Sequence, residues 1–260
     1  MTENTHQNSA GSVSGAEGQW FGFKPVDPSK KASLVRDVFD SVASRYDLMN
    51  DLMSVGVHRL WKNDLIDWIA PRAGQRLLDV AGGTGDISFR FLERAPTASA
   101  ALCDINEAML RVGRDRAIDK GLLKGLDYIV GDAMALPLPD RSVDVCTIAF
   151  GLRNVTEIDK ALAEMRRVLK PGGRFFCLEF SQVKVPGFDK FYDWYSFNIL
   201  PHIGSKVAGD REAYQYLVES IRRFPPQDEL AARMAAVGFE KVEYRNLSGG
   251  IAAIHRGWRL

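Results

Sequence analysis

Residues 76 to 180 alternate between short apolar runs and amphipathic helical patterns, and this alternation constrains the fold more than any other feature. The apolar runs end at turn residues, as buried strands do, and the segments between them carry apolar residues at helical spacing. Strands are expected at Arg76–Ala81, Ser99–Cys103, Leu126–Val130, Val143–Phe150 and Arg174–Phe180, and helices at Asp86–Arg94, Glu107–Lys120 and Glu157–Leu169. Such βαβ units predict an α/β fold with a doubly wound, mostly parallel, Rossmann-like sheet.

The segments on either side of this alternation extend the same domain. Residues 1–19 are polar and lack an apolar stretch, so we expect a disordered leader and no secretory signal. Helical spacing of apolar residues predicts helices from Ser33 to Met49 and over His58–Ile69. After residue 180 we expect helices at Glu212–Arg223 and Gln227–Val237, then a hairpin of Lys241–Asn246 and Ile251–Trp258 around Gly249-Gly250. The prediction is one domain over residues 20–260, with a helical lid inserted at about 183–225.

Composition excludes several classes of protein. The 34 Lys and Arg residues nearly balance 33 Asp and Glu residues, so the chain lacks the long-range field of a general nucleic-acid binder. No apolar run approaches the roughly 18–20 residues that span a bilayer. Cys103, Cys146 and Cys177 lie in apolar runs without a CxxC pair, and the four histidines lack metal-ligand spacing. We therefore expect a soluble, intracellular protein with buried thiols and no metal.

The segment Leu77–Asp86 combines an apolar strand, a glycine-rich turn and the start of a helix. Glycines there allow close approach of a ligand, and N–H groups at the helix start favour anionic groups. A dinucleotide site has the pattern G-x-G-x-x-G, but the series from Gly83 and Gly85 reaches Ser88 at the third glycine. Asp79 followed by closely spaced glycines resembles the turn of adenosylmethionine-dependent methyltransferases, although Ala81 occupies the position of their first glycine.

Two further carboxylates follow neighbouring strands. Asp104 comes after the strand Ala100–Cys103, where a carboxylate can accept both ribose hydroxyls. Dinucleotide enzymes share this feature, so it indicates an adenosine ribose without specifying the cofactor. Asp132 and Ala133 follow the third strand, where methyltransferases of this class hold the adenine.

Several segments of the chain are similar to one family. They are Phe39–Asn50 (FDSVASRYDLMN), His58–Lys62 (HRLWK), Phe150–Val155 (FGLRNV), Leu169–Gly173 (LKPGG) and Gly249–Trp258 (GGIAAIHRGW). Together they resemble the ubiquinone/menaquinone biosynthesis C-methyltransferases, from about Gly22 to Leu260. LKPGG and the glycine turn occur in many methyltransferases, whereas the other segments are more specific. The resemblance implies a class I methyltransferase fold: seven strands with a C-terminal antiparallel hairpin, N-terminal helices and a lid.

The resemblance also implies a reaction, in which the methyl group of S-adenosylmethionine moves to a ring carbon of a polyprenylated quinol. The family's cofactor residues correspond to Thr84, Asp104, Asp132 and Ala133. Some relatives carry a serine before the Phe-Gly turn, where this chain has Ala149. With the turn residues, the expected cofactor site comprises Asp79, Gly83, Thr84, Gly85, Asp104, Asp132 and Ala133.

Carbon methylation needs an electron-rich ring carbon, and ionising a quinol hydroxyl makes the ortho carbon nucleophilic, so we expect a proton acceptor or a group that stabilises a phenolate. The family analogy places Arg153 beside the reacting ring. Because arginine is a poor base, we expect Arg153 to stabilise the phenolate and Asn154 to orient it or a water. Tyr46, with Asp47 beside it, is the next candidate, on the helix expected to cover the site. His58 and His202 are alternative bases, for which a structural role is the better interpretation.

The aromatic residues of Phe188–Phe197 fit either lid packing or an apolar entrance for an isoprenoid tail. The second interpretation predicts a cytoplasmic enzyme that associates peripherally with the inner membrane. The resemblance is also compatible with a homo-oligomer and with contacts to other quinone-biosynthesis enzymes, while no nucleic acid is expected.

Alternative functions remain open from the sequence. Another small-molecule methyltransferase would retain the glycine turn but would not account for the turn at Arg153-Asn154 or the C-terminal hairpin. A noncatalytic scaffold subunit could share the whole fold. Ser88 disfavours a nicotinamide dehydrogenase.

Overall fold

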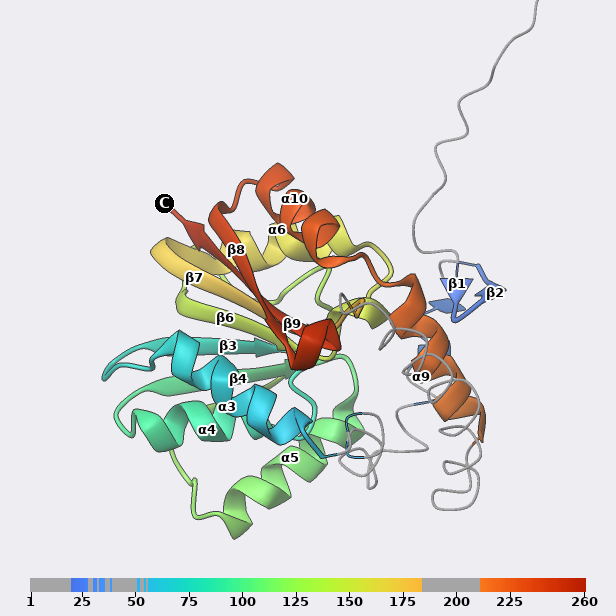
Figure 1. The fold of residues 1–260 in the computed structure, drawn as a ribbon. Coiled ribbons are helices and arrows are strands. Elements are labelled where there is room, and N and C mark those ends of the chain that lie inside the picture. The colour runs from blue at the N-terminus through green and yellow to red at the C-terminus, as the bar shows by residue number, and fades with distance from the viewer. Residues whose placement is uncertain are drawn as a thin grey trace, which may run out of the picture.

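The computed structural model describes residues 20–27, 30–31, 33–35, 38, 51, 54, 56–183 and 211–260. Its centre is a seven-stranded sheet in the order β5-β4-β3-β6-β7-β9-β8 (Figure 1). The strands are β3 (Arg76–Val80), β4 (Ser99–Asp104), β5 (Leu126–Val130), β6 (Val143–Ala149), β7 (Leu169–Phe180), β8 (Glu240–Leu247) and β9 (Ala252–Arg259). β3 to β7 run parallel, whereas β9 is antiparallel to both of its neighbours. The predicted doubly wound sheet with a C-terminal hairpin is confirmed.

Helices cover both faces of this sheet (Figure 1). They are α3 (His58–Ile69), α4 (Asp86–Arg94), α5 (Glu107–Asp119), α6 (Ile158–Val168), α9 (Arg211–Arg223) and α10 (Gln227–Ala236), with short 3₁₀ turns η2 (Leu152–Asn154) and η4 (Ser248–Gly250). A small hairpin of β1 (Trp20–Phe21) and β2 (Lys24–Pro25) lies beside α9.

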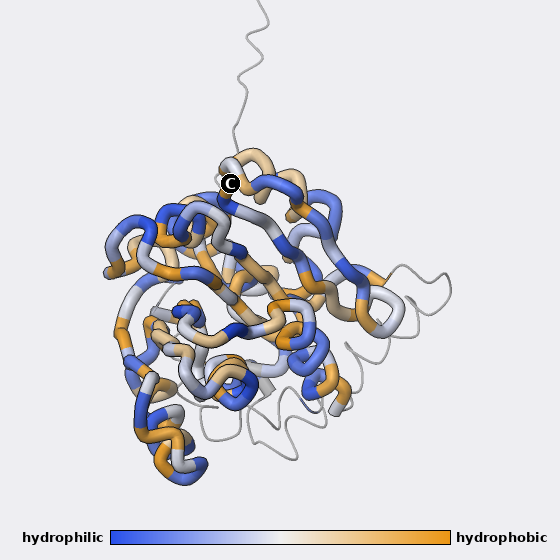
Figure 2. Tube along the Cα trace, turned by 90° about the vertical axis from the view of Figure 1, so that its left-hand side faces the viewer, coloured by the Kyte–Doolittle hydropathy of each residue, from blue (hydrophilic) through white to orange (hydrophobic). Residues whose placement is uncertain are grey.

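Alternation along β3 explains why the sheet is covered on both sides. Leu77 joins an apolar cluster with Trp61 of α3 and Phe91 of α4, whereas the next residue, Leu78, joins a second cluster with Leu162 of α6. Successive side chains of a strand point to opposite faces, so a strand with two apolar faces requires helices on both. Hydrophobic residues accordingly gather at the inner part of the molecule, whereas hydrophobic and hydrophilic residues alternate along the helical coils (Figure 2).

The start of β7 differs from the sequence prediction. We expected the helix to end at Pro171-Gly172-Gly173 and the strand to begin at Arg174, but β7 begins at Leu169. Leu169 pairs with Val143, and the next regular pair joins Arg174 to Val145, so the intervening residues bulge from the ladder. Gly172 has φ +79°, a conformation that glycine adopts without strain.

Several predictions fall on residues outside the described ranges. These are the leader 1–19, most of the helix from Ser33 to Met49, and residues 184–210 of the proposed lid, which include the aromatic run Phe188–Phe197. The single-domain interpretation therefore stays a prediction. Across the residues that are described, none of the helices has the length and apolarity needed to cross a membrane.

Candidate active site

The glycine-rich turn joins β3 to α4 through left-handed backbone conformations. Gly83 and Gly85 have φ +55° and +87°, and Ala81 has φ +49°. A Cβ on Gly82 would lie 2.2 Å from Cδ1 of the buried Leu102, so a larger residue there would force Leu102 to shift. The turn thus packs tightly against β4 and leaves its other side to line a cavity.

Asp79 stabilises this turn through side-chain hydrogen bonds. Its side chain is buried and accepts hydrogen bonds from Ser88 Oγ at 2.9 Å and from Thr147 Oγ1 at 2.8 Å. Burial raises the pKa of Asp79 to about 6, against the opposing effect of the two hydroxyls. Ser88, which broke the dinucleotide pattern, therefore ties α4 to the end of β3, and Asp79 joins both to β6.

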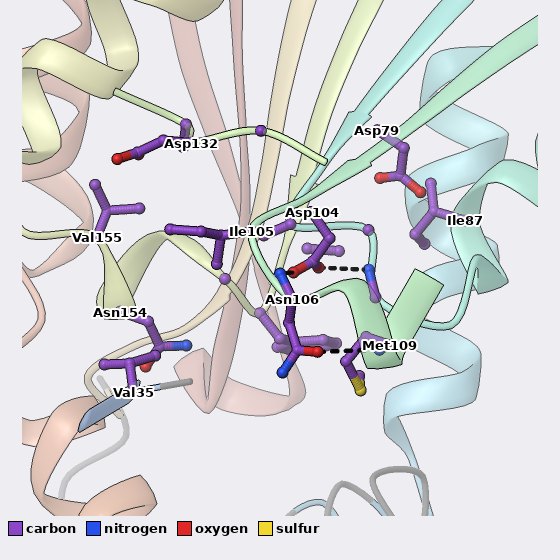
Figure 3. Close-up of a pocket in the computed structure, with 18 of the residues that line it drawn as sticks. Val35, Asp79, Ile87, Asp104, Ile105, Asn106, Met109, Asp132, Asn154 and Val155 are labelled. Carbon is purple, nitrogen blue, oxygen red and sulfur yellow. Dashed lines mark hydrogen bonds between the residues drawn. The ribbon is translucent and has the colours of Figure 1, made fainter. Parts of the chain in front are cut away.

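Asp104 lies at the opposite side of the turn, at the end of β4. Its Oδ2 accepts the N–H of Gly83 and its Oδ1 accepts the N–H of Asn106, each at 2.8 Å (Figure 3). Burial raises the pKa of this carboxyl to about 6, although the backbone N–H groups favour its ionised form. A carboxylate has about four acceptor positions, and the backbone N–H groups of Gly83, Ile105 and Asn106 do not use all of them, so Asp104 can still accept from a ribose hydroxyl.

These residues meet at one cavity along the carboxyl ends of the parallel strands (Figure 3). Of the predicted residues, Asp79, Gly83, Thr84, Asp104, Asp132, Ala133 and Asn154 line it. Asp132 bonds the N–H of Met134 at 2.8 Å, and Thr84 accepts a bond from Arg116 at 3.0 Å. Gly85 lies outside the lining and instead forms the N-cap of α4.

Lys62 is a lining residue that the sequence reasoning missed. Among the described residues of the cavity wall it is the one cationic side chain, and it is only 5% exposed. Its Nζ lies 2.8 Å from Asp86 Oδ2, while Arg90 Nε lies 3.0 Å from Asp86 Oδ1. Burial would raise the pKa of Asp86, but the two cations outweigh it and lower that pKa. The available signal was a charge four residues before Ile66 on the buried face of α3.

Arg153 and Asn154, adjacent in η2, point to different surroundings. Asn154 lines the cavity, whereas Arg153 does not and its side chain is fully buried. Arg153 Nη1 lies 2.7 Å from Glu179 Oε1 and also donates to the carbonyl of Phe150. The predicted contact between Arg153 and a reacting ring stays a prediction. The contacts that Arg153 makes in the structure attach η2 to β7, which carries Glu179.

The remaining candidate bases divide between structural and undescribed residues. His58 is 1% exposed, with Nε2 2.8 Å from Asp51 Oδ1, and burial lowers its pKa. This environment fits the structural role expected for it. Tyr46, Asp47 and His202 lie outside the described residues. In the described part of the chain, no group of three His, Cys, Asp or Glu side chains forms a metal site.

The sequence profile of the ubiE/COQ5 methyltransferase family matches residues 27–259. The chain belongs to this family. It is 59% identical over 240 residues to the ubiquinone/menaquinone biosynthesis C-methyltransferase UbiE of Dinoroseobacter shibae, covering 92% of this chain and 96% of that protein. The UbiE of Brucella abortus is 55% identical over 257 residues, covering 98% and 95%. The resemblance drawn from the motifs is confirmed, and the chain is an S-adenosylmethionine-dependent methyltransferase.

Solved structures support the fold independently. A Thermotoga maritima protein described as a SAM-dependent methyltransferase, possible histamine N-methyltransferase, aligns with TM-score 0.60 at 20% identity, over 86% of this chain and 99% of that one. The [4+2]-cyclase SpnF aligns with TM-score 0.64 at 18% identity, over 86% and 95%. Because a cyclase shares it, this fold leaves the reaction open, and function must be argued from the site.

Proposed function

We propose that this methyltransferase transfers the methyl group of S-adenosylmethionine to a ring carbon of a polyprenylated quinol. The substrate would be 2-polyprenyl-6-methoxy-1,4-benzoquinol, demethylmenaquinol or both. The observation that carries the proposal is the 59% identity to a ubiquinone/menaquinone biosynthesis C-methyltransferase over 96% of that relative.

The cavity chemistry fits the cofactor at its adenosine end. Asp104 offers two carboxylate oxygens to the ribose hydroxyls, with its position set by the N–H groups of Gly83 and Asn106. Asp132 and Ala133 would hold the adenine beside them, since both line the same cavity. When bound, the cofactor supplies a methyl group already activated on a sulfonium, so the protein's task is to position the reactants and manage a proton.

Lys62 fits the other end of the cofactor. The methionine part carries a carboxylate, and a carboxylate requires a cation or N–H donors when it leaves water. Asp86 is shared between Lys62 and Arg90, so two cations face one carboxylate. An incoming carboxylate beside Lys62 would balance this cluster, and we infer that Lys62 recognises the amino-acid end of the cofactor.

The ring would then lie near Asn154, where the cavity meets η2. A carboxamide N–H beside the quinol oxygen would stabilise the phenolate that makes the neighbouring carbon nucleophilic. Arg153 would support this residue from behind, because its pairing with Glu179 anchors the backbone that carries Asn154. Tyr46 stays in the proposal as a second candidate for handling the proton.

A polyprenyl substrate brings the enzyme to a membrane surface. Each buried CH₂ is worth about 0.8 kcal/mol, so a long tail stays in the bilayer unless protein covers it. We therefore propose peripheral association with the inner membrane from the cytoplasmic side. The run Phe188–Phe197 is the candidate apolar contact.

Methyl transfer from labelled cofactor tests this function. Purified protein is incubated with S-adenosylmethionine carrying a ¹³C methyl group and, in separate reactions, each of the two quinols in detergent. We expect a new ring-carbon methyl signal by NMR, and its absence with both substrates would overturn the proposal. A methyl signal on oxygen would instead indicate a different small-molecule methyltransferase.

A further inference from the structure

The carboxamide of Asn154 is held by a residue far along the chain. Tyr216 of α9 donates a hydrogen bond from its hydroxyl to Asn154 Oδ1 at 2.9 Å. Figure 3 shows the result: the Asn154 nitrogen points into the cavity, and the oxygen points away from its centre. The hydrogen bond from Tyr216 is thus made to the end of the amide that faces away from the cavity.

Tyr216 is itself fixed by its surroundings. It is 5% exposed, and Phe21 of the N-terminal hairpin stacks on its ring at 4.2 Å between centroids and 16° between planes. The N–H of Phe23 bonds Glu219 one turn further along α9, at 2.9 Å. The hydroxyl has little freedom to leave Asn154, because both the helix and the hairpin hold the ring.

Burial keeps the Tyr216 hydroxyl protonated. Burial raises the pKa of Tyr216 well above its usual value; Arg153 opposes this effect and Glu179 adds to it. The phenol therefore stays protonated across the physiological range. A protonated hydroxyl can donate to the amide oxygen at every pH at which the enzyme would work.

The direction of the Asn154 amide matters for the chemistry. The two ends of a carboxamide are nearly the same size, so a rotation of its terminal torsion exchanges donor and acceptor at little steric cost. An amide oxygen turned to the cavity would repel a phenolate, whereas an N–H would stabilise it. The turn itself does not orient the amide, because the hydrogen bond that Asn154 donates to the carbonyl of Gly151 comes from its backbone N–H.

We propose that Tyr216 is a positioning residue whose hydroxyl holds the Asn154 oxygen and thereby presents the amide N–H to the quinol oxygen. The presentation to a quinol rests on the proposed function, whereas the hold on the amide does not. Tyr216 makes no contact with the reacting atoms in this proposal, and acts only through Asn154.

A substrate-free measurement tests the hold on the amide. The Asn154 Cγ resonance is recorded by NMR in the complex with S-adenosylhomocysteine and assigned by its loss in Asn154→Ala. Tyr216→Phe keeps the stacked ring and removes the hydroxyl, so the resonance should move upfield as the oxygen loses its donor. Tyr214→Phe, which removes another buried hydroxyl from α9, is the matched control and should leave it in place. A resonance unmoved by Tyr216→Phe would overturn the proposal.

Steady-state kinetics test the consequence for catalysis. Loss of one orienting hydrogen bond should lower kcat roughly tenfold in Tyr216→Phe, with the KM for the quinol within about twofold. In an Asn154→Ala background the same change should have no further effect, because the residue it orients is gone. If Tyr216→Phe still lowers kcat roughly tenfold in the Asn154→Ala background, the proposal is overturned. If Tyr216→Phe moves the resonance but the wild-type enzyme is inactive on both quinols, the proposed function is contradicted while the hold of Tyr216 on Asn154 is supported.

Discussion

The two ends of the cavity are built in different ways. At the end proposed to bind the adenosine, called the adenosine end below, Asp104 accepts hydrogen bonds from the backbone N–H groups of Gly83 and Asn106. At the end proposed to bind the quinol, called the ring end below, Asn154 is held by Tyr216 and the adjacent Arg153 by Glu179. The first end depends on backbone donors, and the second on side chains brought together from separate elements.

This difference changes how each end supports buried charge. Burial raises the pKa of Asp104 and of Glu179 alike. For Asp104 the opposing effects come from backbone N–H groups, whereas for Glu179 the largest opposing effect is the Arg153 guanidinium. The adenosine end should therefore respond most to pH, and the ring end to loss of one member of its ion pair.

Breaking the ion pair should have the largest effect. Glu179→Met leaves the Arg153 guanidinium buried without its carboxylate and should lower the free energy of unfolding by about 3–5 kcal/mol. Adding Arg153→Met should restore most of that stability, since two apolar side chains then replace the pair. Urea unfolding of the three variants measures both effects. A loss below about 1 kcal/mol in Glu179→Met would contradict the importance given to this pair.

Removing the cavity cation should affect binding without loss of fold. Lys62→Met should weaken S-adenosylhomocysteine roughly 10–100-fold, since a charge-assisted bond to a carboxylate is lost. The affinity for 5′-methylthioadenosine, which lacks the amino-acid part, should stay unchanged. Calorimetry with both ligands separates this role from general damage. Arg59→Met, on the exposed side of α3, is the control, and equal losses for the two ligands would contradict the assignment.

The adenosine end should lose affinity in acid. Because burial raises the pKa of Asp104 to about 6, the carboxyl takes up a proton as pH falls through 6 and then offers fewer acceptors to the ribose. We expect binding of S-adenosylhomocysteine to weaken about tenfold between pH 7 and pH 5. Asp104→Asn should bind weakly with little pH dependence. A wild-type affinity that is flat over this range would contradict the role of Asp104.

The smallest effect is expected for Ala81→Gly, where the glycine turn meets η2. Ala81 has φ +49°, so Ala81→Gly should relieve backbone strain and raise the free energy of unfolding by up to about 1 kcal/mol. A Cβ on Gly151 would lie 2.6 Å from that of Ala81, and Gly151→Ala should cost about 1–3 kcal/mol. Combining the two should reduce that cost, because only one Cβ then occupies the space. If urea unfolding shows that the two substitutions change the free energy of unfolding additively, the glycine turn and η2 do not contact each other at these two positions.

Much of the cavity lining around Asp104 was predictable because its signals are local. Strand periodicity placed Asp104 at the end of β4, and the glycine spacing predicted a turn, in which Gly83 and Gly85 have left-handed backbone angles. Lys62 was missed because the sequence does not show that α4 places Asp86 beside it. Without that partner, a lysine on the apolar face of a helix carries no functional signal. The bulge before Arg174 was missed because strand pairing, and not propensity, extends β7 back to Leu169.

The sequence by itself determined the alternating fold, the family and several of the residues that line the cavity around Asp104. Each depends on residues within one strand–turn–helix unit or on motifs conspicuous in the chain, and backbone geometry follows from them directly. Only the tertiary structure decided that Arg153 turns inward to Glu179 while Asn154 faces the cavity. The sequence does not distinguish which of two adjacent turn residues faces a site. Their side-chain directions depend on partners such as Tyr216, which is far from Asn154 in the chain.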